Sequence, residues 1–478
     1  MSIFEKKRAE SKICINQLRS FVYGSLEYYK KIEEVALKLE KLHPTSSAFS
    51  YLEKSREDQI KYAYSFAGKM IEEDLFDNIN GETPHEVTFM INIEMPGGVS
   101  NIMLRPVIEA LGSDEQKSYW LSLIDSQKII GAYAQTELAH GSDVQSLETE
   151  AEWDEKQNIF ILRTPSISAI KWWPGELGNL GNVAVVFAKT IVKGKRVGVL
   201  PFIVQLRDLE THEVLPGVEI GDIGPKLGYM AKENGYLRFK DIKLPSSSLL
   251  SRFWEISKNG ELITKGNPKI LYSAMMKVRI FLLLASAQAL GKSVAIALRY
   301  SCLRKQFKDS QKQEIPIISY QLQRYKLFPL LARSFAMLST YKKIKDIVNQ
   351  TNIEVKQGIF KNFQETHILL SGSKALFTSW ALDGSVICMQ CCGGHGYAQS
   401  SGIPGIMQTI APNTILEGEN TVLFLQVGQF LLKNARYIKE GKIERVSNHC
   451  KYLTQLFESE QLIDTFKIDV STVNGIIS

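Results

Sequence analysis

The hydrophobic period of this 478-residue chain changes twice, and this change is the strongest constraint on its fold. The middle of the chain, residues 131–267, has short runs rich in β-branched and aromatic residues between glycines and prolines, which is typical of strands. These runs lie at 159–162, 170–173, 183–187, 197–204 and 235–239. Because no segment between them has helical spacing over the length of a crossover helix, we expect an antiparallel, barrel-like sheet.

The residues on both sides of this β-domain have apolar side chains at helical spacing. Before it, the run Ser113, Asp114, Glu115 and Gln116 predicts the start of a helix. After it, four long helices are expected at 270–304, 319–350, 360–390 and 420–440, and helices of this length form a bundle. The prediction is an α+β multidomain fold with a helical domain at 1–130, an antiparallel β-barrel-like domain at 131–267, a four-helix bundle at 268–442 and a short tail at 443–478.

The composition is that of an ordinary globular protein, with 44% hydrophobic and 23% charged residues. The net charge of +6 suits an anionic small molecule, and since no basic tract contains interleaved aromatic residues, we expect no nucleic acid partner. The six cysteines lack the spacing of a disulfide framework or a zinc site, so we expect no metal. The most apolar runs are short or contain charged residues, so they predict buried helices and no membrane span.

A candidate catalytic base lies in the segment 412–421, just before the last long helix. Glu417 follows an apolar run and precedes Gly418, where the backbone can turn tightly and the free N–H groups of a helix start favour a negative group. In the alternative interpretation, Glu419 or Asn420 caps the helix and Glu417 is a solvated loop acid. The segment by itself leaves both interpretations open.

A candidate cofactor-binding segment lies where the β-domain begins, at residues 132–144. The side chains of Gln135, Thr136 and Ser142, together with backbone amides near Gly141, suit the polar edge of a planar cofactor or its phosphates. The same residues could equally form an ordinary polar turn before a strand. Further along, the tryptophans at 172 and 173 precede a turn at Gly175, and they could form either a stacking wall or part of the core.

Six motifs, in this order, resemble the peroxisomal acyl-CoA oxidases, which are flavoenzymes of the acyl-CoA dehydrogenase superfamily. The similarity extends from about residue 20 to residue 442 and is weakest in the first hundred residues. The motifs lie at Tyr133–Glu137 with Gly141 and Ser142, Lys171–Gly175, Gly221–Lys226, Tyr325–Leu331, Cys392–Tyr397 and Glu417–Thr421.

The resemblance implies that FAD lies between the β-domain and the bundle and across a dimer interface. It implies that Glu417 removes the α-proton of an acyl-CoA while hydride passes to FAD, giving trans-2-enoyl-CoA, and that O2 is then reduced to H2O2 in fatty acid β-oxidation. Carried over by position, Arg279 meets the CoA portion of the substrate, and Arg304 reaches the FAD pyrophosphate of the other subunit. The remaining residues expected at the cofactor are Gln135, Thr136, Ser142, Gly175, Gln321 and Gly394.

Two alternatives to an oxidase stay open: a dehydrogenase that passes electrons to an electron-transfer flavoprotein, and a non-catalytic partner subunit of a full-length oxidase. The expected assembly is a homodimer or a heterodimer with a related oxidase. The resemblance implies a peroxisomal location, but the chain ends at Asn474–Ser478 without a Ser-Lys-Leu type signal, so a cytoplasmic location also stays open. Relatives have a further helical domain after the bundle, and we expect most of it to be missing here.

Overall fold

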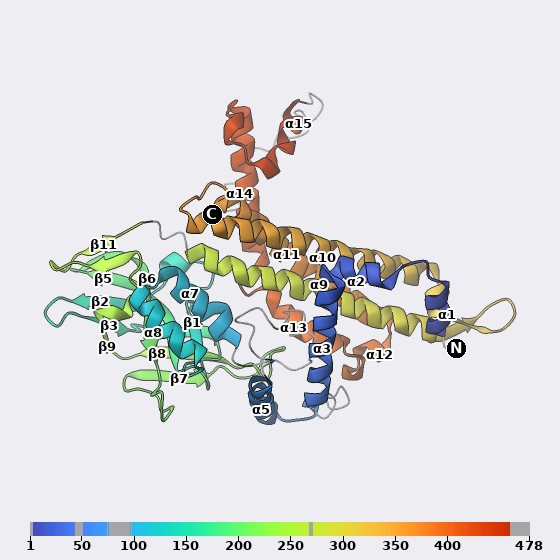
Figure 1. The fold of residues 1–478 in the computed structure, drawn as a ribbon, viewed down its shortest axis with the longest axis horizontal. Helices are drawn as coiled ribbons and strands as arrows, with labels where there is room; N and C mark the ends of the chain where they lie inside the picture. Colours follow the sequence, from blue (N-terminus) through green and yellow to red (C-terminus); the bar gives the residue numbers. More distant parts are fainter. Residues whose placement is uncertain are drawn as a thin grey trace.

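The computed structural model describes residues 3–43, 51–73, 75, 96, 98–266 and 271–458. Figure 1 shows the β-domain at one end of the long axis and the long helices extending from it to the other end. This arrangement confirms the predicted α+β fold, with helices first, a curled sheet in the middle and a bundle last.

The first part of the chain forms helices that begin at polar caps. Ser25, Ser55 and Ser113 each accept a backbone N–H at a helix start. Ser113 and Gln116 form the reciprocal capping box that their spacing predicts, with bonds of 3.2 and 2.9 Å. The sequence also predicts a helix from Met90 to Ala110, but residues 90–95 and 97 of this range lie outside the described residues. The elements are α1 (Ile3–Glu10), α2 (Ile15–Tyr23), α3 (Leu26–Leu42), α5 (Arg56–Glu72), a π-helical turn η2 (Ser100–Leu104), α7 (Arg105–Leu111) and α8 (Asp114–Asp125).

The main sheet has six strands, and its centre is β5 (Val183–Val192). One edge of β5 pairs with β1 along its first half and with β2 along its second half, while the other edge pairs with β6. Most residues of β5 are buried, which agrees with its continuous apolar sequence. The other strands of this sheet are β1 (Gly131–Ala134), β2 (Glu150–Asp154), β3 (Ile159–Arg163), β6 (Lys195–Gln205) and β9 (Ile242–Pro245).

The expectation of a wholly antiparallel sheet is wrong in one respect, because β1 and β2 both run parallel to β5. Parallel pairing needs a long crossover connection, but that connection need not be a helix. Here residues 135–182 connect β1 to β5, and they contain β2, β3, β4 and the short 3-10 turn η3 (Val144–Ser146) instead of an α-helix. A second sheet of three antiparallel strands contains β4 (Lys171–Gly175), β8 (Asn234–Phe239) and β7 (Val218–Asp222), and β10 (Trp254–Ile256) pairs with β11 (Leu262–Thr264).

The bundle contains the four long helices expected from the sequence. They are α9 (Leu271–Leu303), α10 (Gln321–Lys356), α11 (Phe363–Cys391) and α14 (Asn420–Lys439). The hairpin of β12 (Lys305–Lys308) and β13 (Glu314–Pro316) joins α9 to α10, and the short helices α12 (Gly394–Tyr397) and α13 (Ile403–Ile410) follow α11. In Figure 1, α14 and α15 (Tyr452–Glu458) project from the body of the molecule.

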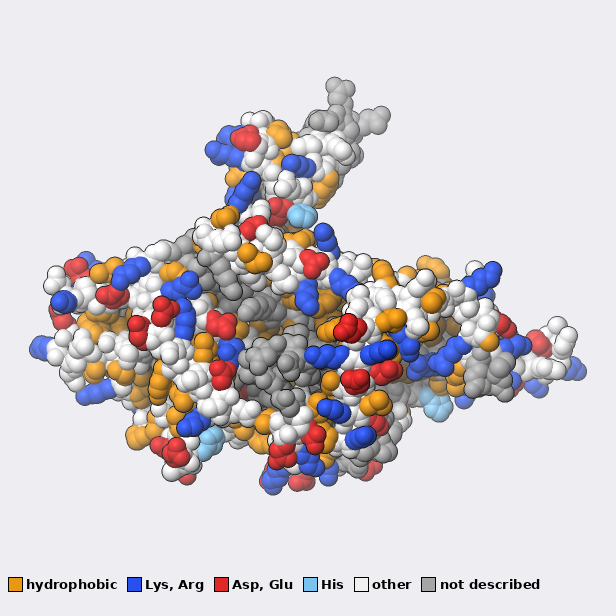
Figure 2. Space-filling view, in the orientation of Figure 1, with side chains coloured by type: hydrophobic (Ala, Val, Ile, Leu, Met, Phe, Trp, Pro, Cys, Tyr) orange, Lys and Arg blue, Asp and Glu red, His pale blue; other side chains and the backbone are white. Residues whose placement is uncertain are grey.

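Within the described part of the chain, one stretch of α9, Val278–Leu303, is apolar and long enough to cross a membrane. It packs against α10 and α11, and 61% of its most apolar window is buried, as for the central helix of a bundle. On the face shown in Figure 2, basic and acidic side chains are interspersed over the described surface.

Candidate active site

Glu417 lies on a tight turn between α13 and α14. Its φ of 57° and the φ of 103° at Gly418 put two successive residues in the left-handed region, which costs a residue with a side chain about 1 kcal/mol or more. A side chain at Gly418 would also collide with Leu423, whose nearest atom would lie 2.8 Å from the new Cβ. The turn is therefore a strained conformation that the surrounding contacts must hold.

The two interpretations of this segment can now be separated. The carboxylate of Glu419 caps α14 by accepting the Val422 N–H at 3.1 Å. Glu417 is not a solvated loop acid, since its Oε2 atom is buried and has no hydrogen-bond partner in the described part of the chain. Burial raises the pKa of the Glu417 carboxyl, and the nearby charges of Arg279 and Lys374 offset only part of that effect. A desolvated carboxylate of this kind is a stronger base than an exposed one.

Two buried cations hold the backbone of this turn. Arg279 on α9 donates from Nε to the Glu417 carbonyl at 3.1 Å and from Nη1 to the Ser371 hydroxyl at 2.8 Å. Lys374 on α11 donates to the Gly418 carbonyl at 2.7 Å. Close by, burial and the charge of Arg279 lower the pKa of His367 to about 4, so this imidazole is neutral at physiological pH.

The predicted cofactor residues of the β-domain form a second group. The Trp172 N–H donates to the Thr136 carbonyl at 3.0 Å, so the segment containing Gln135 and Thr136 lies alongside β4, which ends at Gly175. A Cβ at Gly175 would lie 3.3 Å from Val99, so a side chain here would fill the space beside the strand. Thr136 is half-buried, and Ser142 is exposed on the adjoining loop.

A buried ion pair fixes this segment to β4. Lys171 donates to the Glu137 carboxylate at 2.9 Å, to the Gln135 carbonyl at 3.0 Å and to the Phe187 carbonyl at 2.7 Å. The hydroxyl of Thr149 donates to the same carboxylate at 2.6 Å. The pair is therefore fully hydrogen-bonded, as a buried ion pair must be to avoid a large desolvation penalty.

The two tryptophans of β4 differ in their surroundings. The ring of Trp172 stacks on Tyr236 of β8, with centroids 5.9 Å apart, so it packs within the sheet. Trp173 has a φ of 86°, and 53% of its surface is exposed. The packing interpretation thus holds for Trp172, while Trp173 presents its ring to the outside.

The third group contains Arg304, Gln321 and Gly394, and all three are exposed. Arg304 follows the end of α9, Gln321 begins α10 and Gly394 follows α11. The side chain of Gln323 bridges two of these helix ends by donating to Cys391 and Ser301, both at 2.9 Å. In Figure 1 this end of the bundle, with the yellow hairpin after α9, lies at the opposite end of the long axis from the β-domain. One chain alone therefore does not bring this group to the β-domain.

Lys374, Glu137 and Lys171 are not among the predicted site residues. Lys374 could have been found from the sequence, because it is a charged residue in the middle of an apolar helical run. For the pair in the β-domain no local signal exists, because Glu137 and Lys171 are 34 residues apart.

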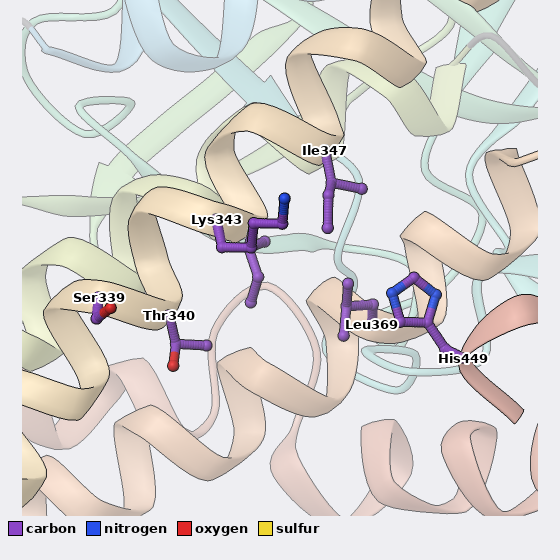
Figure 3. Close-up of a pocket in the computed structure, with 7 residues that line it drawn as sticks. Ser339, Thr340, Lys343, Ile347, Leu369 and His449 are labelled. Carbon is purple, nitrogen blue, oxygen red and sulfur yellow. The ribbon is translucent and has the colours of Figure 1, made fainter. Parts of the chain in front are cut away.

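Two cavities lie elsewhere in the described part of the chain. One, of about 330 Å³, lies between α10, α11 and the segment after α14 and is lined by Ser339, Thr340, Lys343, Ile344, Ile347, Leu369 and His449. Figure 3 shows these side chains. The other, of about 520 Å³, lies at the β2–β3 turn. Neither is lined by a predicted site residue.

Comparison with known proteins places the chain in a family. Residues 272–432 match the family model described as "Acyl-CoA oxidase, C-alpha1 domain", and residues 15–130 match "Acyl-coenzyme A oxidase N-terminal". The chain is 39% identical over 369 residues to peroxisomal acyl-coenzyme A oxidase 1 of Mus musculus, covering 77% of this chain and 55% of the relative. An acyl-coenzyme A oxidase of Caenorhabditis elegans is 38% identical over 386 residues, covering 80% and 57%.

Solved structures agree with this assignment. Acyl-CoA oxidase 1 of Arabidopsis thaliana superposes with a TM-score of 0.88 at 33% identity, covering 95% of this chain and 70% of that one. Acyl-CoA oxidase-2 of Caenorhabditis elegans, solved bound with FAD, ascaroside-CoA and ATP, gives 0.88 at 32% identity, covering 94% and 69%. This chain belongs to the acyl-CoA oxidase family. It spans about half the length of the curated relatives that it matches.

Proposed function

We propose that this protein is an FAD-dependent acyl-CoA oxidase that uses Glu417 as its catalytic base. The single observation that carries this proposal is the Oε2 atom of the half-buried Glu417, which is itself buried and has no hydrogen-bond partner among the described residues, on a turn held by Arg279 and Lys374. An unpaired buried carboxyl group is costly, and such a cost is typical of a functional site.

The residues of the β-domain fit a flavin. Thr136 and Gln135 offer a hydroxyl and an amide beside β4, and Gly175 leaves the backbone open to close approach. Arg304 offers an exposed guanidinium fork, which suits the two oxygens of a phosphate. We assign Gln135, Thr136, Ser142 and Gly175 to the flavin, together with Arg304, Gln321 and Gly394.

The reaction requires a base strong enough to remove the weakly acidic hydrogen on the carbon next to a thioester. Desolvation makes Glu417 such a base, and the proton is transferred to its carboxylate. FAD, held by the residues assigned above, would supply the hydride acceptor for the β-carbon, and O2 would take up the electron pair with two protons to give H2O2. The product is trans-2-enoyl-CoA. Arg279 lies under the Glu417 turn, so its predicted contact with the CoA portion requires a substrate that reaches this buried position.

The proposed assembly rests on the positions of the two cofactor groups. Because the end of α9 with its hairpin lies at the other end of the long axis from the β-domain (Figure 1), we infer that Arg304, Gln321 and Gly394, at the adjoining helix ends, serve the flavin of a second subunit, in a homodimer or a heterodimer with a related oxidase. The names of the curated relatives support a peroxisomal location. Cell fractionation that finds the protein only in the cytosol would contradict that location.

The decisive experiment is the visible spectrum of the purified protein under anaerobic conditions, with and without an acyl-CoA. An oxidase or a dehydrogenase binds flavin, and its flavin band bleaches when the acyl-CoA is added. Admission of O2 then separates the two, because an oxidase yields one H2O2 per enoyl-CoA. A protein that binds no flavin even with excess FAD is instead the non-catalytic partner subunit.

A further inference from the structure

Lys374 occupies an unusual position in the middle of α11. Its side chain is 0% exposed. A buried ammonium group is expensive unless it is fully hydrogen-bonded, and an apolar side chain at the same place in a helix interface would not carry that cost. Its two acceptors are the Gly418 carbonyl at 2.7 Å and the Asn420 side-chain oxygen at 3.0 Å. Both flank Glu419: Gly418 immediately follows the proposed base, and Asn420 lies three residues after it.

The same lysine is tied to the start of α14 through Asn420. The amide nitrogen of Asn420 donates to the Ala375 carbonyl at 3.0 Å and to the hydroxyls of Thr378 at 2.9 Å and Ser379 at 3.0 Å. Lys374 and Asn420 thus fasten the start of α14 to α11. Because the Glu417 carbonyl is bonded to Arg279, each of the two consecutive carbonyls of the strained turn accepts a hydrogen bond from a buried cation on a different helix.

We propose that Lys374 is a positioning residue for the proposed base: by its hydrogen bond to the Gly418 carbonyl it holds the Glu417–Gly418 turn in its left-handed conformation, and its buried charge acts on the Glu417 carboxyl. This inference rests on the proposed function only for its kinetic consequence. The effect of Lys374 on the ionisation of Glu417 can be measured whether or not the protein turns over an acyl-CoA.

The electrostatics agree with this geometry. Burial lowers the pKa of Lys374 to about 8, with a further contribution from Arg279, while Glu417 and Glu419 act in the opposite direction. The ammonium group therefore remains mostly charged at pH 7. The charges that act on Glu417 are those of Arg279 on α9 and Lys374 on α11. Removal of one of two cations beside a buried carboxylate should raise its pKa by about one unit or more.

The test is an infrared pH titration of the Glu417 carboxyl in the full chain, with the band assigned by its loss in Glu417→Gln. In Lys374→Gln, which keeps an N–H donor but loses the charge, we expect Glu417 to ionise about one pH unit higher or more. Lys374→Arg should restore most of the difference. The matched control is Lys292→Gln on α9, where burial also lowers the lysine pKa to about 8 but where Glu417 is not affected.

The kinetic readout depends on the proposed function. If the protein is active, Lys374→Gln should move the acid limb of the kcat profile to higher pH and so lower kcat on that limb, with little change in KM. If the wild-type chain shows no turnover, the proposed function fails but the infrared titration still decides the role of Lys374. An unchanged ionisation of Glu417 in Lys374→Gln overturns the proposal.

Should Lys374→Gln fail to fold, the double variant K374Q/E417Q decides. If the charge of Lys374 compensates the Glu417 carboxylate, removing that carboxylate recovers the folded state. If Lys374 only fills and fastens the helix interface, the double variant stays unfolded and the proposal is rejected.

Discussion

The Nζ atom of Lys171 lies 2.9 Å from Oε1 of Glu137, and neither side chain is exposed to solvent. The two residues come from the segment and the strand that carry Thr136 and Gly175, the proposed flavin contacts. Each partner is also bonded to neighbouring groups, Lys171 to the Gln135 and Phe187 carbonyls and Glu137 to Thr149. The relative position of the two flavin contacts therefore depends on this pair.

Lys171→Met should destabilise the β-domain by about 3–5 kcal/mol, because it leaves the Glu137 carboxylate buried without its cation. Flavin should be lost at the same time, since the 135–142 segment is no longer fixed to β4. Urea unfolding and the ratio of bound FAD to protein measure the two effects. Lys61→Met is the control, because its ion pair with Glu57 is exposed and its loss should have no measurable effect. Normal flavin content in Lys171→Met would contradict the argument.

The same pair predicts how stability falls in acid. Burial tends to raise the pKa of Glu137, but Lys171 and the hydrogen bonds from Thr149 and Glu148 outweigh it, so the pKa lies below its ordinary value. A carboxyl group with a depressed folded-state pKa contributes stability above its unfolded-state pKa of about 4.3, and that contribution is lost as the pH falls through the folded-state pKa. In Glu137→Gln, the loss of stability that comes from protonation of Glu137 should be absent. Unfolding midpoints of the variant and the wild type, measured between neutral and acidic pH, will test this.

Glu417→Gln should abolish turnover while flavin and acyl-CoA binding remain. The reason is that the amide has almost the shape of the carboxyl group but cannot accept the α-proton. At neutral pH the variant should be as stable as the wild type or more stable, because burial raises the pKa of Glu417 and its ionisation therefore opposes folding. Anaerobic flavin bleaching and thermal unfolding at pH 7 check both statements. Near-normal bleaching in this variant would remove Glu417 from the role of base.

The elements of the fold could largely be predicted because their signals are local. Helical spacing over α9 and α11 and the Ser113 capping box each lie within one segment, and the structure confirms them. The parallel pairing of β5 with β1 and β2 could not be predicted in this way. Strand pairing depends on contacts between distant segments, and the period of each strand is the same in both orientations.

Only part of the candidate site could be predicted from local sequence. Glu417 and Gly418 stood out because a carboxylate before a glycine at a helix start has a recognisable chemistry. The contacts of Arg279 and Lys374 with the turn could not be predicted, although the resemblance places Arg279 at the substrate, since the two residues reach the turn from helices 138 and 44 residues away. A lysine in an apolar helix indicates a buried partner but does not identify it.

Gly394→Ala distinguishes an effect on FAD binding from an effect on folding stability at the distal end of the bundle. Among the described residues, no atom outside the adjoining backbone lies within 4 Å of a Cβ built at Gly394, so the substitution should leave the unfolding midpoint unchanged. If the flavin approaches this backbone, FAD affinity should nevertheless fall, and fluorescence titration of the apoprotein with FAD measures it. Gly393→Ala is the contrasting variant, because a φ of 59° with a ψ of −146° should destabilise the fold by about 1–3 kcal/mol. Unchanged FAD affinity in Gly394→Ala would exclude Gly394 from the flavin site.

A hybrid dimer tests whether each flavin site is shared between two subunits. Gly175→Val blocks the β-domain part of a site, and Arg304→Ala weakens the part at the distal end of the bundle, so each homodimer should retain little FAD. In a hybrid of one Gly175→Val chain and one Arg304→Ala chain, shared sites place both substitutions in one site and leave the other intact. The purified hybrid should then bind about half the wild-type amount of FAD. If Arg304 served the flavin of its own chain, both sites would carry one defect, and the hybrid would bind no more FAD than the homodimers do.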